Sequence, residues 1–246
     1  MGKFDGILFL SDMDGTLLHN AKLSEENRKA IEYFTENGGL FTVATGRAPE
    51  FIKKFNLKIN APIISINGTI IYDLKNEHII KDYFLMPEMI DAAKFAAENL
   101  PVIRFSFFLE TSEMRVLPDE LDFEKVKGTL RKVVFVFETE TEAISAKERL
   151  YEKFGYGAVF ERSWPTGVEM RPKNGGKGVC LKFLKEYMGI KTTVAAGDYE
   201  NDLSLLEAAD ISFAPANAID EIKKIADKTV VSCEEHAISD IIYNLL

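Results

Sequence analysis

A short apolar segment that runs directly into acidic residues is the feature that most constrains this chain. Residues 7–10 read Ile-Leu-Phe-Leu, which is typical of a buried strand, and residues 11–16 read Ser-Asp-Met-Asp-Gly-Thr. Burying ionised carboxylates is costly unless a cation or hydrogen-bond donors compensate for the lost water. The two acids Asp12 and Asp14, placed where a core strand ends, therefore indicate a site that holds a cation.

The overall charge excludes several kinds of partner. The chain has 246 residues, of which 46% are hydrophobic and 28% charged, with a formal net charge of -9. This composition is typical of a soluble globular protein with one large or two modest domains. An acidic chain lacks the basic face that nucleic acids and anionic membranes require, so neither is expected as a partner. Small anionic metabolites remain possible, because a bound metal reverses the local charge.

The cysteines and the first residues favour a cytoplasmic protein. Cys180 and Cys233 are far apart and form no CxxC pattern, which is typical of reduced structural thiols. The N-terminus shows no basic segment followed by an apolar segment and a cleavage site. No apolar run approaches the ~18 residues that a membrane-spanning helix needs.

The order of predicted elements divides the chain. Strands and helices alternate up to about residue 81 and again from about residue 173, which is typical of a parallel sheet covered by helices. Between them, neighbouring strands with short links favour an antiparallel sheet with helices on one face, and Thr141 is expected to cap a helix there. We therefore predict an α/β fold: a Rossmann-like parallel-sheet core, residues 1–81 and 173–246, with an inserted α+β domain, residues 82–172.

Further polar clusters follow other predicted strands, and in an open parallel sheet ligands bind at these strand ends. Thr45 and Gly46 come directly after the strand at 40–44, and a hydroxyl with an accessible backbone N–H suits phosphate oxygens. Lys177 stands at the start of a predicted helix, where an ammonium group and the helix N-terminus both favour an anion.

A last cluster follows the strand at 193–196. Residues 197–202 read Gly-Asp-Tyr-Glu-Asn-Asp, and their side-chain oxygens fit a hard divalent cation such as Mg²⁺. Each of these patterns also has a structural explanation when it is considered alone: a capped turn, a common strand-end turn, a solvated lysine or a helix N-cap.

Taken together and in this order, the motifs resemble those of the haloacid dehalogenase superfamily. They are DxDGT at 12–16, TGR at 45–47, a lysine at 177 and GDxxND at 197–202. The insert falls between the second and third motifs, where this superfamily carries its type C2 cap. Residues 66–73, Ile-Asn-Gly-Thr-Ile-Ile-Tyr-Asp, resemble a segment of the Cof-type, subclass IIB members.

The resemblance implies a Mg²⁺-dependent phosphatase that works through an aspartyl-phosphate. Asp12 would be the nucleophile, and Asp14 would protonate the leaving group and later activate water. Thr45 and Lys177 would hold the phosphoryl oxygens. Gly46 and Asn67 would be further substrate contacts.

The resemblance also implies a metal-binding set. Mg²⁺ would be held by the Asp12 carboxylate, the Asp14 backbone carbonyl and Asp198. Asn201 and Asp202 would support the metal through water or orient Lys177. Specificity would lie in the cap, whose arginines, Arg171 among them, are expected on solvated faces. His19, His78 and His236 are scattered without metal-ligand spacing and receive no role.

We therefore expect hydrolysis of small phosphate monoesters, either sugar phosphates or phosphorylated cofactors, by a monomer or weak homodimer. One alternative is a phosphomutase or phosphotransferase on the same core. An alternative of another class is a non-catalytic metabolite-binding protein, although a binder has no need of both Asp12 and Asp14.

Overall fold

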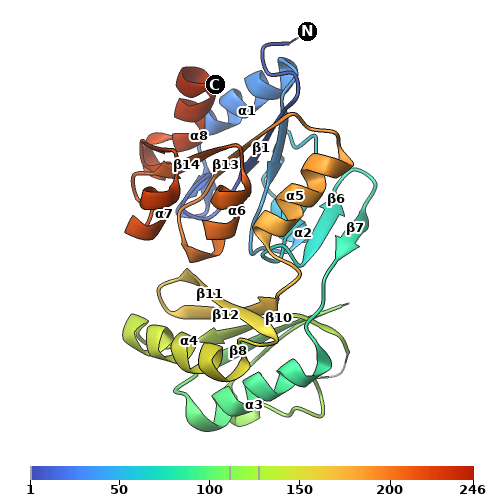
Figure 1. The fold of residues 1–246 in the computed structure, drawn as a ribbon, viewed down its shortest axis with the longest axis vertical. Coiled ribbons are helices and arrows are strands. Elements are labelled where there is room, and N and C mark those ends of the chain that lie inside the picture. Colours follow the sequence, from blue (N-terminus) through green and yellow to red (C-terminus); the bar gives the residue numbers. More distant parts are fainter. Residues whose placement is uncertain (1, 111, 127) are drawn as a thin grey trace. The chain divides into compact units, whose positions relative to one another are not determined.

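The computed structural model describes residues 2–110, 112–126 and 128–246, which divide into two compact units (Figure 1). The core unit combines Met1–Lys81 with Lys177–Leu246, and the inserted unit comprises Asp82–Gly176.

A parallel sheet forms the centre of the core unit. Its order is β15-β14-β13-β1-β4, so β1, the first strand of the chain, lies next to β13 from the far side of the insert. The strands are β1 (Ile7–Ser11), β4 (Leu40–Val43), β13 (Thr192–Ala196), β14 (Ile211–Pro215) and β15 (Lys228–Val230). All four pairings are parallel. The predicted α/β core is confirmed.

Helices cover this sheet. Ser24 caps α1 by accepting a hydrogen bond from the backbone of Asn27, and α1 and α8 pack side by side in the main apolar cluster (Figure 1). The helices are α1 (Glu25–Glu36), α2 (Pro49–Lys53), α5 (Lys177–Tyr187), α6 (Leu203–Ala208), α7 (Asp220–Ile225) and α8 (Ala237–Asp240). Among the residues described, no helix is both long and apolar enough to cross a membrane.

Two small sheets complete the core unit. One is the hairpin of β2 (Leu18–His19) and β3 (Lys22–Leu23), which follows the acidic motif. The other contains β5 (Ile63–Ser65), β6 (Ile70–Asp73) and β7 (His78–Asp82). A parallel bridge between Ala44 and Ile64 joins β5 to the end of β4. These sheets flank the strand ends at which the polar motifs lie.

The β2–β3 hairpin has a two-residue turn that contains an unfavourable alanine. Asn20 and Ala21 have φ angles of 49° and 56°, as a type I′ turn requires. A side chain in this left-handed region costs about 1 kcal/mol or more, whereas glycine loses somewhat more chain entropy on folding. We expect Ala21→Gly to raise the free energy of unfolding by about 0.5–1 kcal/mol in urea titrations.

The matched control is Ala216→Gly, at an exposed alanine whose φ angle is negative. It is expected to lower the free energy of unfolding slightly. Equal destabilisation by both variants would contradict the strain assigned to Ala21.

The inserted unit is an antiparallel sheet in the order β11-β12-β10-β8-β9, with α3 and α4 on one of its faces (Figure 1). Its own apolar cluster includes Phe105, Phe107, Phe135 and Leu150. The strands are β8 (Arg104–Leu109), β9 (Glu113–Val116), β10 (Leu130–Val136), β11 (Ala158–Trp164) and β12 (Gly167–Pro172), and the helices are α3 (Ile90–Asn99) and α4 (Glu140–Phe154). The insert is therefore α+β, as predicted.

Two local predictions in the inserted unit are wrong. The cap of α4 is Thr139, not Thr141, because Thr139 and Glu142 satisfy each other's backbone N–H groups in a capping box. Arg171 is buried rather than solvated. Its guanidinium donates to both oxygens of Glu161 at 2.7 and 2.8 Å and to the carbonyl of Gly175 at 3.1 Å, which compensates for its burial.

Candidate active site

Strand pairing brings the first and last motifs together. β1 and β13 run in register up to the pair Ser11 and Ala196, and the backbone N–H of Asp12 donates to the Ala196 carbonyl at 2.8 Å. Because both strands end here, Asp12 and Asp198 emerge at the same edge of the sheet. The interaction between these two motifs, far apart in the chain, is thus a consequence of the parallel register.

Lys177 links this edge to the start of α5. Its side chain is fully buried, and its Nζ donates at 2.6 Å both to Asp12 Oδ1 and to Asp202 Oδ1. Burial lowers the pKa of Lys177, but the charges and hydrogen bonds of the two carboxylates outweigh burial and hold the pKa above that of an ordinary lysine. The ammonium group therefore stays charged between Asp12 and Asp202.

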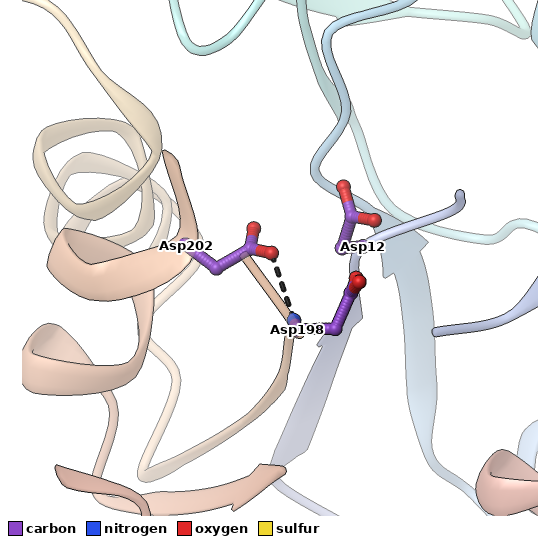
Figure 2. A group of neighbouring side chains, drawn as sticks. All are labelled: Asp12, Asp198 and Asp202. Atoms are coloured by element: carbon purple, nitrogen blue, oxygen red, sulfur yellow. Dashed lines mark hydrogen bonds between the residues drawn. The ribbon is translucent and has the colours of Figure 1, made fainter. Parts of the chain in front are cut away.

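Asp12, Asp198 and Asp202 form a carboxylate cluster. Each offers an oxygen within 4.8 Å of the others, and Figure 2 shows the Asp12 and Asp198 carboxyl groups next to each other. Burial raises the pKa of Asp12 well above its usual range even though Lys177 opposes the shift. Burial, followed by the charge of Asp202, raises the pKa of Asp198 to about 7. The single positive charge of Lys177 therefore balances only part of the negative charge of the three carboxylates.

The cluster fits a hard divalent cation, because its ligand atoms are all carboxylate oxygens in a partly buried site. The three carboxylates are not equivalent. Asp202 already uses Oδ1 for Lys177. Its Oδ2 accepts the backbone N–H of Asp198 at 3.0 Å, shown by the dashed line in Figure 2, and that of Tyr199 at 3.2 Å. Both oxygens of Asp202 are thus engaged by Lys177 and by backbone N–H groups, and Asp12 and Asp198 stay the predicted metal ligands.

The loop after β1 is fitted closely to Asp198. Thr16 Oγ1 donates to Asp198 Oδ1 at 2.8 Å, and Gly15 has a φ of 90°. A side chain at Gly15 would also collide with the Asp198 carboxylate. The Asn217 amide donates to the Gly15 carbonyl at 2.8 Å. Sequence reasoning assigned no role to Thr16 or Asn217; Thr16 lies within a quoted motif, but nothing in the sequence identifies Asn217.

Asp14 is not part of this carboxylate cluster and pairs with Arg47. The guanidinium donates Nε–H to Asp14 Oδ2 at 2.8 Å and a terminal N–H to Oδ1 at 3.1 Å, and it lies 4.4 Å from the centre of the Phe51 ring. The side chains of Asp14 and Arg47 are 42% and 47% exposed, so water can compete for both. Arg47 was part of the predicted TGR motif but received no role from the sequence.

A second set of contacts joins the loops of Thr45, Asn67 and Asn201. The Asn67 N–H donates to the Thr45 carbonyl at 2.9 Å, and the Asn201 amide donates to Asn67 Oδ1 at 3.2 Å. A Cβ on Gly46 would lie 3.2 Å from the same Oδ1. Ile66 and Asn67 have φ angles of 50° and 53°, so this turn is strained at a β-branched residue. Asn67 is buried and placed to orient Asn201.

All predicted site residues therefore belong to the core unit. Direct contacts connect them in two groups, and Asn201 and Asp202, adjacent in the chain, link the groups. The first group is Asp12, Lys177, Asp198 and Asp202. The second is Asp14, Thr45, Gly46, Asn67 and Asn201, with Arg47 between Asp14 and Thr45. Their chemical roles stay predictions.

Comparison with known proteins places this architecture in a family. The haloacid dehalogenase-like hydrolase family matches residues 9–120 and 108–242. The chain is 29% identical over 279 residues to 5-amino-6-(5-phospho-D-ribitylamino)uracil phosphatase YwtE of Bacillus subtilis (strain 168), covering 96% of this chain and 96% of that protein.

Solved structures share the fold. A haloacid dehalogenase-like hydrolase from Bacillus subtilis superposes with a TM-score of 0.84 at 22% identity, covering 97% of this chain and 99% of that one. The subclass IIB sugar phosphatase BT4131 superposes with a TM-score of 0.82 at 22% identity, covering 96% and 97%.

The chain therefore belongs to the haloacid dehalogenase-like hydrolase family. It is an enzyme, and both the predicted resemblance and the predicted fold are confirmed.

Proposed function

We propose that the protein is a phosphatase that hydrolyses small phosphate monoesters through an aspartyl-phosphate on Asp12, with Mg²⁺ as its cofactor. The observation that carries the proposal is the buried Lys177 ammonium, held at 2.6 Å from both Asp12 and Asp202 beside the Asp198 carboxylate. A phosphate dianion repels a carboxylate nucleophile, and an ammonium and a divalent cation at the same place offset that repulsion.

In the first half-reaction an Asp12 carboxylate oxygen attacks phosphorus and forms the new P–O bond. The P–O bond to the alcohol breaks, and Asp14 gives the leaving oxygen its proton. Lys177 and the Thr45 hydroxyl hold phosphoryl oxygens as the charge shifts. Because both Asp14 oxygens accept from Arg47 in the structure, Arg47 has to release at least one of them before Asp14 can act.

In the second half-reaction water attacks the phosphorus of the aspartyl-phosphate. Asp14 takes the proton from that water, the P–O bond to Asp12 breaks, and inorganic phosphate leaves with the original carboxylate restored. The two half-reactions thus use the same pair of residues in opposite directions, which returns the enzyme to its starting state.

The metal would be held by the Asp12 carboxylate, the Asp14 carbonyl and Asp198, with Asn201 and Asp202 in support. When bound, Mg²⁺ supplies positive charge to the phosphoryl oxygens and to the attacking carboxylate. The chain's own contribution is to hold the ligands: Thr16 fixes one oxygen of Asp198, and Asn67 fixes the amide of Asn201.

For the substrate we propose a phosphorylated sugar or a phosphorylated cofactor. A relative of 29% identity is named for a phosphoribityl substrate, and a structure with the same fold is a sugar phosphatase. Residues 82–172 remain, as a proposal, the cap that selects among such substrates, and a monomer or weak homodimer remains the expected assembly.

The test is phosphate release from p-nitrophenyl phosphate by the full chain. We expect turnover with Mg²⁺, its loss on addition of EDTA, and recovery when excess Mg²⁺ is restored. Turnover that continues at the same rate in EDTA would contradict the metal assignment. A mutase would instead isomerise a sugar phosphate faster than it releases phosphate and would need a bisphosphate activator. A panel of phosphorylated metabolites then identifies the substrate class.

A further inference from the structure

Arg47 belongs to the TGR motif at 45–47, yet the proposed reaction requires of it only that it release Asp14. In the structure its guanidinium donates to both Asp14 oxygens, at 2.8 and 3.1 Å. While this pair persists, the oxygens that would exchange protons with the leaving group and with water are occupied. A group that binds during the reaction therefore has to draw the guanidinium away.

The backbone of Arg47 is anchored more firmly than its side chain. Its N–H donates to Thr45 Oγ1 at 3.2 Å, and its carbonyl accepts the Ile66 N–H at 3.2 Å and the Ser65 hydroxyl. The side chains of Arg47 and Asp14, by contrast, are about half exposed, and an ion pair that water reaches contributes little net free energy. The guanidinium can thus change its partner while the backbone that carries it keeps its contacts.

The surroundings of Arg47 suit a phosphoryl group. Thr45 Oγ1 accepts the Arg47 N–H, which leaves this hydroxyl able to donate its own proton to a phosphoryl oxygen. The hydrogen bond to Asp14 raises the pKa of Arg47 against partial burial, and the charge of Asp12 adds to the rise. The guanidinium is therefore close enough to the proposed nucleophile to be affected by its charge.

We propose that Arg47 is a substrate-binding residue that exchanges the Asp14 carboxylate for the phosphoryl group of the substrate. This inference rests on the proposed phosphatase function, in which Thr45 holds that group and Asp12 attacks it. A phosphate monoester dianion carries twice the charge of a carboxylate, and its oxygens match the planar fork of the guanidinium. The exchange releases both Asp14 oxygens, so Asp14 becomes available for proton transfer only once a phosphoryl group is bound.

The test uses inorganic phosphate as the probe, titrated calorimetrically into the full chain in excess Mg²⁺ at slightly alkaline pH. Arg47→Gln is expected to weaken phosphate binding by at least about tenfold. Arg47→Lys keeps the charge but not the fork, so its loss should be smaller. The matched control is Arg28→Gln, at an arginine of the same unit that donates to the carbonyls of Phe55 and Asn56, and it should bind phosphate as the unmodified chain does.

A double-mutant cycle separates exchange from simple repulsion. Asp14→Asn removes the carboxylate that competes for the guanidinium, so it should tighten phosphate binding by at least about threefold when Arg47 is present. In the Arg47→Gln background the same change should tighten binding clearly less. Equal tightening in both backgrounds would mean that Asp14 acts on phosphate by repulsion alone, which overturns the exchange. Thermal melts establish that each variant is folded.

Release of phosphate from p-nitrophenyl phosphate distinguishes the two ways in which the inference can fail. If the unmodified chain with Mg²⁺ neither binds phosphate nor turns over this substrate, the proposed function is wrong and the inference falls with it. If the unmodified chain turns over the substrate while Arg47→Gln binds phosphate as tightly as Arg28→Gln, only the role of Arg47 is wrong.

Discussion

Replacing Asp12 by asparagine is expected to abolish phosphate release from p-nitrophenyl phosphate, with a fall in kcat of at least about 10³-fold. The amide is no nucleophile, so the aspartyl-phosphate cannot form. The fold should persist, because Lys177 keeps Asp202 as a charged partner and a neutral amide is easier to bury than the carboxylate whose pKa burial already raises. Steady-state kinetics and a urea titration measure the two effects.

The matched control is Asp91→Asn, at an exposed aspartate of the inserted unit. It should retain the original kcat and stability. If Asp12→Asn kept the rate of Asp91→Asn, Asp12 would not be the nucleophile. If it lost activity only because it unfolded, the urea titration would show a large fall in the free energy of unfolding, whereas we expect a change within about 1 kcal/mol.

Lys177→Met should damage both stability and activity. Methionine fills similar space without the charge, and the Asp12 and Asp202 carboxylates then face each other unpaired in a buried site. Removing one partner of a buried ion pair costs about 3–5 kcal/mol, and losing a charge that stabilises the transition state lowers kcat by at least about 10²-fold. Urea titrations without Mg²⁺ measure the first effect and steady-state kinetics with Mg²⁺ the second.

The stability deficit of Lys177→Met should depend on pH in a defined direction. A carboxyl group whose pKa is raised by folding stabilises the protein below its unfolded pKa, and this contribution is lost as the pH rises through its folded pKa. Burial raises the pKa of Asp198 to about 7 even though the Lys177 ammonium opposes the shift. The deficit should therefore widen between about pH 4 and above pH 7. Lys182→Met, at an exposed position of the same helix, is the control, and equal deficits at all pH values would contradict this electrostatic origin.

The sequence identifies the fold well where local patterns determine it. The apolar run before Asp12, the cap at Ser24 and the strand–helix alternation each depend on neighbouring residues, and each predicts its element. The location of the site follows from the same strand–helix alternation, because parallel strands bring their carboxyl ends to one edge of the sheet. The grouping of Asp12, Lys177 and Asp198 could therefore be expected before the structure was known.

Side-chain pairings between distant segments could not be predicted in this way. Thr139 and Thr141 are both acceptable caps by type, and only the reach of Glu142 back to the Thr139 N–H decides between them. Arginine is usually exposed, so the sequence alone predicts a solvated Arg171. Its burial is explained only by its partner Glu161 on the neighbouring strand. The same is true of Arg47 and Asp14: charge alone does not select one partner among the many acids of this chain.

The place of β1 in the core sheet has a consequence for the order of events at the ribosome. β1 lies between β4, which is synthesised before the insert, and β13, which is synthesised after it. Until Thr192–Ala196 emerges, one edge of β1 has no neighbour and exposes backbone groups beside an apolar face, a surface that invites intermolecular pairing. Asp82–Gly176 is continuous and has its own apolar cluster, so it can pack during this interval. The first strand of the core sheet therefore stays without one of its neighbours until the whole insert has been synthesised.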